Sequence, residues 1–190
     1  MKNILFVCTG NTCRSPMAEG LFRKSAAARG IDVEVRSAGV SAIDGSTISR
    51  HAAAVLRDHD IQDVITSSSV NRDLVQWADL ILTLTGSHKQ QVIHHYPECA
   101  DKIYTLKEYA EDDPKVLADL KERDRLYAEW QMKRALGQEV LASDRQRIIE
   151  IQQRIPSFDI SDPFGGSRED YDVTAAEIRS AVERVLDKLS

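Results

Sequence analysis

The sequence predicts an α/β fold: a three-layer α/β/α arrangement around a small, four-stranded parallel sheet that is doubly wound. Short apolar runs alternate along the chain with segments of helical periodicity, and strands separated by helices pair in parallel. One segment, at about 113–156, lacks a convincing strand and is dense in charges of both signs. We therefore expect residues 1–190 to form a single domain that carries an inserted helical hairpin.

Four runs of sequence predict the strands. The first, at 2–7, is an apolar run typical of a strand that is buried on both faces. Ligands of open parallel sheets bind beyond the carboxyl ends of the strands, so the residues that follow this run are of special interest. The other predicted strands are VEVRSAG at 33–39, ADLILTLT at 78–85 and KIYTL at 102–106.

Four helices are predicted outside the insertion. Pro16 suits the first turn of the first helix, where a missing N–H costs little, and Gly30 suits the position just after its end. Apolar residues at helical spacing form one stripe on the last helix. The predicted helices begin and end at about 16–29, 49–59 and 87–95, and the last begins near 171.

Two further helices are predicted within the insertion. Pro114 follows two acidic residues, a pattern typical of an N-cap and a first helical turn. Ser143 and Gln146 have the spacing of a capping box that opens the second helix, and Pro156 ends it. We interpret the hairpin as a solvated helical pair, with a lid or a partner-docking surface as the alternative.

Composition excludes several classes of function. The net charge of −5 argues against a basic face for nucleic acid, and no apolar run approaches the length of about 18 residues that spans a membrane. We expect a cytoplasmic protein that binds neither nucleic acid nor membrane. Cys8, Cys13 and Cys99 are too few for a disulfide framework and lack the spacing of a zinc site, so no metal is expected.

The segment CTGNTCRS joins the first predicted strand to the first predicted helix. Consecutive backbone N–H groups in such a loop can surround an anion, and the helix dipole adds positive potential. Arg14 offers a planar fork that matches two phosphate oxygens. The sequence therefore predicts a site for a tetrahedral oxyanion. Its predicted substrate-binding residues are Thr9, Gly10, Asn11, Thr12, Cys13 and Ser15.

Cys8 lies at the base of this loop, where the N–H groups and the dipole would stabilise a thiolate and lower its pKa. Ser15 can donate a hydrogen bond to the sulfur. A thiolate that faces phosphorus is a nucleophile, so the loop predicts phosphoryl transfer through a phosphocysteine. The alternative is that Cys8 is a small buried side chain without a chemical role.

Phosphoryl transfer also needs a proton donor for the leaving group. Asp162 in SDPFGGS is the candidate, since Pro163 stiffens the chain beside it and two glycines allow a sharp turn. A plain surface turn is the alternative. Phe164 follows the acid, and we expect its ring to form a wall of the pocket.

FVCTGNTCRSPMAE together with the late DPFGG resembles the low-molecular-weight protein tyrosine phosphatase family, as do RSAG, ADLILTLT and KIYTLKEY. The resemblance covers most of the chain except the insertion. It implies that Cys8 is the nucleophile, Arg14 the phosphate-binding arginine and Asp162 the general acid. It further implies that Ser15 supports the thiolate, that Asn11 holds the loop shape, and that no cofactor is needed.

Two positions resemble the bacterial protein arginine phosphatase branch of that family. Thr12 stands where tyrosine-specific members commonly have a branched aliphatic residue, and Thr85 where they often have Asp. A threonine hydroxyl can hydrogen-bond a guanidinium, and Phe164 could stack on it. We therefore expect phosphorylated proteins as partners, with phosphoarginine preferred. The alternatives are a tyrosine phosphatase and a neutral exchange at Thr12.

Three different functions have less support from the sequence. A thioredoxin-coupled arsenate reductase needs two further cysteines after the third strand, where only Cys99 is near. A phosphocysteine carrier, or a non-enzymatic anion-binding regulator, would not need the acid at Asp162. Cys13 could trap an oxidised Cys8 as a disulfide, or it could simply be a packed small residue. The sequence does not indicate the oligomeric state.

Overall fold

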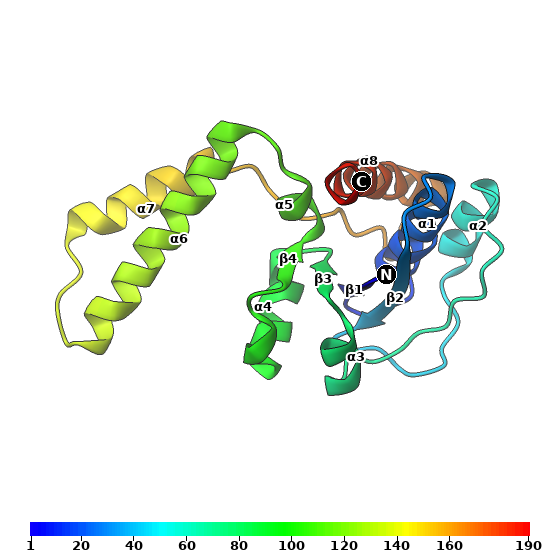
Figure 1. Ribbon diagram of the computed structural model, residues 1–190, viewed down its shortest axis with the longest axis horizontal. Helices are drawn as coiled ribbons and strands as arrows, with labels where there is room; N and C mark the ends of the chain where they lie inside the picture. Colours follow the sequence, from blue (N-terminus) through cyan, green and yellow to red (C-terminus); the bar gives the residue numbers. More distant parts are fainter. The chain divides into compact units, whose positions relative to one another are not determined.

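The computed structural model describes all residues from 1 to 190, and its core is a four-stranded parallel sheet (Figure 1). The strands lie in the order β2-β1-β3-β4. The predicted fold class, a doubly wound parallel sheet with helices on both faces, is therefore confirmed. The strands are β1 (Lys2–Cys8), β2 (Val33–Gly39), β3 (Leu80–Thr83) and β4 (Ile103–Thr105).

The strand β1 is central and almost entirely buried. In register, Ile4 of β1 pairs with Val35 of β2 on one side and with Leu80 of β3 on the other. From β1 the chain adds β2 on one side and then β3 and β4 on the other, so the strand order reverses between β1 and β3. Doubly wound sheets bind their ligands at the carboxyl ends of the strands at such a point.

Two hydrophobic clusters cover the two faces of the sheet. One cluster contains side chains of α1, α2 and α8, among them Phe22, Val55 and Ile178. The other contains Val75 of α3 and Val92 of α4. The helices of this part are α1 (Arg14–Ala28), α2 (Arg50–Asp58), α3 (Arg72–Trp77), α4 (Gly86–His95), the 3₁₀ helix η1 (Pro97–Cys99), α5 (Leu106–Ala110) and α8 (Arg168–Leu189).

Several helix boundaries differ from the sequence-based expectation. The last helix starts at Arg168, before the predicted Tyr171, because Ser167 and Asp170 form a capping box at its N-terminus. The short helices α3 and α5 were not predicted, since neither is long enough to show a helical period. The first helix ends as predicted: Arg29 is its C-cap, and Gly30 follows with φ of 68°.

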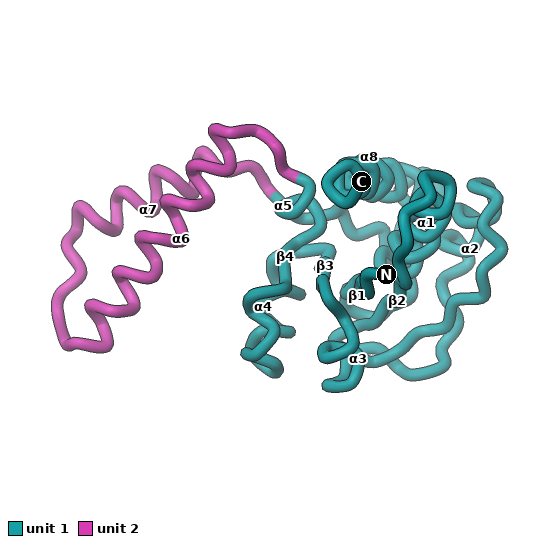
Figure 2. The backbone as a smooth tube through the Cα atoms, in the orientation of Figure 1, with its two compact units in different colours: residues 1–110, 158–190 teal, residues 111–157 magenta.

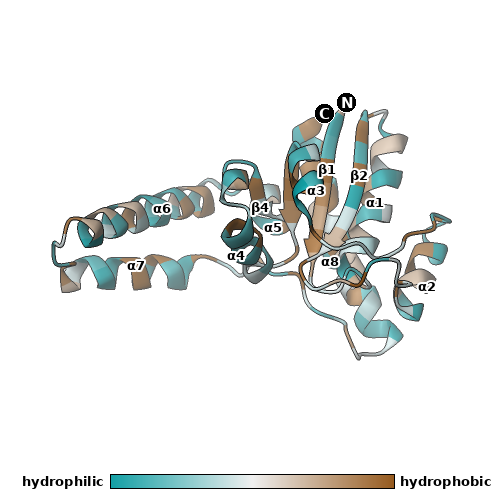
Figure 3. Cartoon of the chain, turned by 90° about the horizontal axis from the view of Figure 1, so that it is seen from below, coloured by the Kyte–Doolittle hydropathy of each residue, from teal (hydrophilic) through white to brown (hydrophobic).

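Residues 111–157 form a second compact unit, separate from the unit of residues 1–110 and 158–190 (Figure 2). It is a pair of helices, α6 (Pro114–Ala135) and α7 (Ala142–Arg154), as the hairpin prediction required. Hydrophobic and hydrophilic positions alternate along both helices (Figure 3). The inner positions bury Leu120, Leu126, Ile148 and Ile151.

Of the three helix ends predicted in this hairpin, two are confirmed and one is wrong. The acidic start of α6 is confirmed, since the Asp113 carboxylate accepts a hydrogen bond from the backbone N–H of Lys115. The capping box at Ser143 is wrong: α7 begins at Ala142 after Leu141, without a side-chain cap, so Ser143 already lies in the first turn. The helix α7 ends at Arg154 with Ile155 as its C-cap, just before Pro156, as predicted.

None of the helices combines the length and the apolar character that a membrane span requires.

Candidate active site

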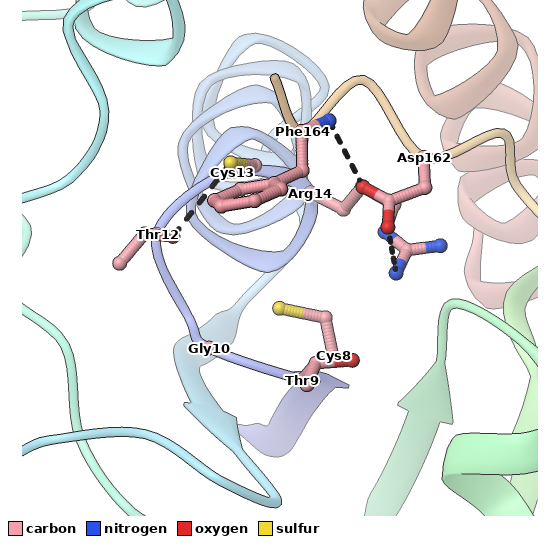
Figure 4. A pocket seen from close by; sticks show the side chains of 8 residues that line it. All are labelled: Cys8, Thr9, Gly10, Thr12, Cys13, Arg14, Asp162 and Phe164. Atoms are coloured by element: carbon pink, nitrogen blue, oxygen red, sulfur yellow. Dashed lines mark hydrogen bonds and ion pairs between the residues drawn. The ribbon is translucent and has the colours of Figure 1, made fainter.

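The loop between β1 and α1 surrounds a pocket of about 230 Å³ at the carboxyl end of β1 (Figure 4). Every side chain that lines it belongs to the larger compact unit. The lining consists of Cys8, Thr9, Gly10, Thr12, Cys13, Arg14, Asp162 and Phe164. The structure thus brings the Cys loop and the DPFGG turn, which are far apart in sequence, to one cavity.

Asn11 determines the shape of the loop. Its φ of 54° is left-handed, a conformation that asparagine tolerates better than most residues. Its fully buried side chain donates to Ser37 Oγ at 2.9 Å and accepts from the backbone N–H of Ser68 at 2.8 Å. The Ser67 hydroxyl donates to the Asn11 carbonyl at 2.7 Å. Asn11 therefore ties the loop to two other segments of the chain.

Gly39, at the end of β2, allows the loop to pass close by. It pairs with Cys8 in the sheet, and a Cβ at this position would overlap the carbonyl oxygen of Thr9 and lie 2.9 Å from the backbone N of Asn11. Gly10, in the loop itself, is less constrained: a Cβ there would lie 3.5 Å from Thr12 Oγ1, an ordinary contact. The loop therefore depends on the small size of Gly39 more than on that of Gly10.

We expect Gly39→Ala to lower the free energy of unfolding by about 1–3 kcal/mol, because backbone atoms must move to admit the methyl group. Urea denaturation followed by circular dichroism measures this change. Gly10→Ala is the matched control and should leave the unfolding midpoint nearly unchanged. Equal stability of the two variants would contradict the close approach at Gly39.

The Cys8 sulfur sits among hydrogen-bond donors. It lies 2.8 Å from Ser15 Oγ and accepts from the backbone N–H of Asn11 at 3.3 Å. The Asn11 side-chain amide donates to Ser15 Oγ at 2.7 Å. Since the serine oxygen accepts from Asn11, its own proton is free to point to the sulfur. This chain of donors favours a thiolate at Cys8.

Burial acts against that thiolate. Cys8 is 3% exposed, and this burial raises the pKa of its thiol above the ordinary value. The hydrogen bonds from Ser15 and Asn11 and the charge of Arg14 lower the same pKa without outweighing burial in the ligand-free protein. The prediction of a lowered pKa at Cys8 therefore does not hold for the ligand-free protein. The sequence showed the hydrogen-bond donors but not how deeply the sulfur is buried.

Arg14, at the start of α1, is held close to the sulfur-bearing loop. Its side chain is 7% exposed, and one guanidinium nitrogen donates to the carbonyl of Ile160 at 3.0 Å. The other terminal nitrogen lies 3.6 Å from the carboxylate of Asp162. A buried guanidinium with one side committed to the protein presents the rest of its fork to the pocket.

Asp162 reaches the pocket from the turn before α8. Its side chain is 57% exposed, and one of its oxygens accepts from the backbone N–H of Phe164 at 3.1 Å. Two contacts fix the preceding residues to the end of β3 and the start of α4: Ile160 N–H donates to the Leu84 carbonyl, and Gly86 N–H donates to Asp159. Asp162 is thus exposed at its tip, and the segment before it is anchored.

The remaining pocket residues form a rim. Phe164 is 79% exposed and lines the same pocket as Cys13 and Arg14 (Figure 4). Thr12 Oγ1 is 3.6 Å from Cys13 Sγ, and Cys13 Sγ is 3.2 Å from the Tyr171 hydroxyl. Cys8 and Cys13 are both free thiols in this structure.

Two predicted substrate-binding residues do not line the pocket. Asn11 and Ser15 are fully buried beneath it, and their side chains act on the loop and on Cys8 instead. Sequence reasoning also missed the residues that support the loop from elsewhere. Among these supporting residues, only Gly39 could have been found from the sequence, because it is a glycine at the end of the strand next to β1. The others are Ser37, Ser67, Ser68, His88 and Tyr171.

The arrangement is suited to phosphoryl chemistry without a metal ligand set. No group of three or more His, Cys, Asp or Glu side chains is arranged to hold a metal ion. The pocket offers a sulfur that can act as a nucleophile, a guanidinium that can bind phosphoryl oxygens, and a carboxyl group that can transfer a proton.

Comparisons with known proteins agree with this chemistry. Residues 3–131 match the family model described as low molecular weight phosphotyrosine protein phosphatase. A protein-arginine-phosphatase from Geobacillus stearothermophilus is 33% identical over 186 residues, which covers 98% of this chain and 95% of that protein. A protein-arginine-phosphatase from Bacillus subtilis (strain 168) is 46% identical over 107 residues, 56% of this chain and 71% of that protein.

A solved structure gives the same result for the fold. The YwlE arginine phosphatase from Geobacillus stearothermophilus matches with a TM-score of 0.71 at 32% identity. The match covers 100% of this chain and 93% of that chain.

Proposed function

Since the chain belongs to the low molecular weight phosphotyrosine protein phosphatase family, we propose that it hydrolyses phosphoarginine residues in proteins through a phosphocysteine intermediate. One observation supports the reaction above all others: the Cys8 sulfur, the Arg14 guanidinium and the Asp162 carboxylate line one pocket. The choice of substrate is supported by the similarity to a protein-arginine-phosphatase over 98% of this chain.

The first step begins with the proton of Cys8 moved to Asp162. The Cys8 thiolate attacks phosphorus, and the bond from phosphorus to the arginine nitrogen breaks. Asp162 gives its proton to the departing nitrogen, so arginine leaves with its guanidinium restored. Arg14 and the loop N–H groups hold the three phosphoryl oxygens, whose charge is largest in the transition state. The products of this step are a free arginine side chain and phosphocysteine.

In the second step, water attacks the phosphocysteine. The Asp162 carboxylate, now deprotonated, takes a proton from that water, and the bond from phosphorus to Cys8 breaks. The sulfur leaves as a thiolate, which the Ser15 hydroxyl and the Asn11 N–H receive as donors. Inorganic phosphate is released, and the cycle has returned every group to its starting state.

The rim of the pocket supports the proposed preference for phosphoarginine. Thr12 supplies a hydroxyl, and the exposed Phe164 ring offers a flat face on which a guanidinium can stack. A phenol ring would gain more from a methyl group at position 12 than from a hydroxyl. The same two side chains could therefore distinguish a guanidinium from a phenol.

The preference can be measured with two peptides of one sequence, carrying either phosphoarginine or phosphotyrosine. We expect phosphate release from the phosphoarginine peptide to have the higher kcat/KM, and Thr12→Ile to reduce the ratio of the two values by about 10–200-fold. Thr47→Ile, which changes a threonine that does not line the pocket, is the matched control.

Other outcomes have distinct meanings. Preference of the wild type for phosphotyrosine would make the protein a tyrosine phosphatase, the alternative that the family description favours. A wild type that prefers phosphoarginine but is insensitive to Thr12→Ile would retain the function and refute the role of Thr12.

We further propose that residues 1–190 act as one phosphatase domain, with the hairpin at about 113–156 as an insertion. The proposed partners are phosphorylated proteins. A cytoplasmic location is proposed because the reaction needs Cys8 as a reduced thiol, the state that cytosolic reductants maintain.

A further inference from the structure

His88 lies in the first turn of α4, beneath the pocket loop, and is not among the residues that line the pocket. It is 3% exposed, and its backbone N–H is held by the N-cap Thr85. Helix α4 starts just after β3, so its first turn faces the carboxyl end of β1 at the opening of the sheet. A histidine buried at this place can contact the loop that carries Cys8 and does not itself line the cavity.

The only side-chain hydrogen bond of His88 goes to the loop. Its Nε2 lies 2.8 Å from Thr9 Oγ1, while its Nδ1 is buried and has no hydrogen-bond partner. Thr9 follows Cys8 directly, is exposed, and lines the pocket. His88 therefore contacts the substrate-binding loop through one hydroxyl group.

The unpartnered Nδ1 indicates which ring nitrogen carries the proton. A buried N–H without an acceptor is rarer in proteins than a buried acceptor without a donor. A neutral ring with its proton on Nε2 leaves only a lone pair unpaired at Nδ1. In that form Nε2–H donates to Thr9 Oγ1, and the hydroxyl proton of Thr9 is left to point elsewhere.

The surrounding charges agree with a neutral ring. Burial, and after it the nearby charge of Arg14, lowers the pKa of His88 to about 4. Asp159 and Asp162, from the turn before α8, act in the opposite direction and do not outweigh these effects. The ring is therefore neutral at neutral pH, and one tautomer can persist throughout the reaction.

From this geometry we propose that His88 is a positioning residue: it donates to Thr9 Oγ1 and thereby directs the Thr9 hydroxyl proton into the pocket, toward a phosphoryl oxygen. This inference rests on the proposed phosphatase function and adds a side-chain donor to the backbone N–H groups of the loop. Thr9 would be the group that touches the substrate, and His88 would act only through it.

A pair of substitutions at His88 tests this role. A glutamine amide reaches about as far as the imidazole Nε2, whereas an asparagine amide reaches only about as far as Nδ1. We expect His88→Asn to reduce kcat/KM for p-nitrophenyl phosphate by about 10–100-fold, as for a lost hydrogen bond to a charged group, and His88→Gln to restore most of it. Thr9→Val should cost as much as His88→Asn.

The double variant separates positioning from a general structural effect. If His88 acts through Thr9, His88→Asn combined with Thr9→Val should be no slower than Thr9→Val alone. Additive losses in the double variant, or equal activity of His88→Asn and His88→Gln, would overturn the proposal. Thermal unfolding of each variant shows whether a loss of activity reflects a loss of folded protein.

Two measurements do not require turnover. Orthovanadate binding should weaken by about the same factor in His88→Asn as in Thr9→Val, and unchanged binding in both would overturn the proposal. In the wild type, long-range ¹H–¹⁵N NMR correlations of the His88 ring should show the proton on Nε2, and a proton on Nδ1 would equally overturn it. Failure to hydrolyse phosphoarginine peptides, by contrast, would refute the proposed function and leave these two results valid.

Discussion

Cys8→Ser is expected to lower kcat by at least about ten-thousand-fold, in line with the loss of a nucleophile in other hydrolases. A serine hydroxyl must lose its proton to attack phosphorus, and the groups around this position donate hydrogen bonds rather than accept a proton. They are the Ser15 hydroxyl, the Asn11 N–H and the Arg14 guanidinium. Steady-state phosphate release from a phosphoarginine peptide measures the loss.

The binding of inorganic phosphate by Cys8→Ser should remain within about tenfold of the wild type, because Arg14 and the loop N–H groups are retained. Cys99→Ala is the matched control. Cys99 is fully buried in the hydrophobic cluster against α3 and α4, and its loss should leave kcat unchanged. Turnover of Cys8→Ser near that of Cys99→Ala would exclude a phosphocysteine mechanism.

Asp162→Asn is expected to lower kcat/KM for a phosphoarginine peptide by about 10²–10⁴-fold, the usual contribution of a general acid. This parameter reports the formation of phosphocysteine and excludes its hydrolysis, in which Asp162 acts as a base on either substrate. The nitrogen that leaves from phosphoarginine is strongly basic and cannot depart without a proton. The p-nitrophenolate that leaves from p-nitrophenyl phosphate is stable as an anion and needs little help. The loss should therefore be much smaller for p-nitrophenyl phosphate. Comparing the losses on the two substrates isolates the contribution of proton donation to the leaving group.

Asp159→Asn is the control for this experiment. Its carboxylate accepts the backbone N–H of Gly86, and an asparagine oxygen can do the same without carrying charge. We expect nearly unchanged turnover of both substrates. Equal losses of kcat/KM on the two substrates in Asp162→Asn would show that Asp162 orients Arg14, 3.6 Å away, rather than giving a proton to the leaving group.

Local sequence rules predicted the sheet and most of the helices. The apolar run at Lys2–Cys8, the acidic residues before Pro114 and the glycine at 30 each specify their structure within a few neighbouring residues. The errors arose where tertiary structure decides. The start of α7 at Ala142, rather than at a Ser143 cap, is not fixed by a hydrogen bond from a capping side chain.

The site was predictable to the extent that it lies in one segment. Cys8 and Arg14 share a loop with recognisable chemistry, and Asp162 could be added because DPFGG is itself distinctive. The supports of the loop come from other elements, so Gly39 and His88 acquire their meaning only from the register of β2 with β1 and from the packing of α4. The burial that raises the pKa of Cys8 is likewise a property of the fold.

The insertion has a consequence for how the length of this chain can vary. It leaves the larger unit at residue 110 and returns at 158, just before the segment that carries Asp162. A flexible segment of this length would raise the closure entropy of that connection by about 2 kcal/mol relative to a short turn. A hairpin that folds on itself avoids most of that loss. Because Ile160 is anchored at Leu84, the connection can gain or lose helical turns while the acid keeps its alignment with Arg14.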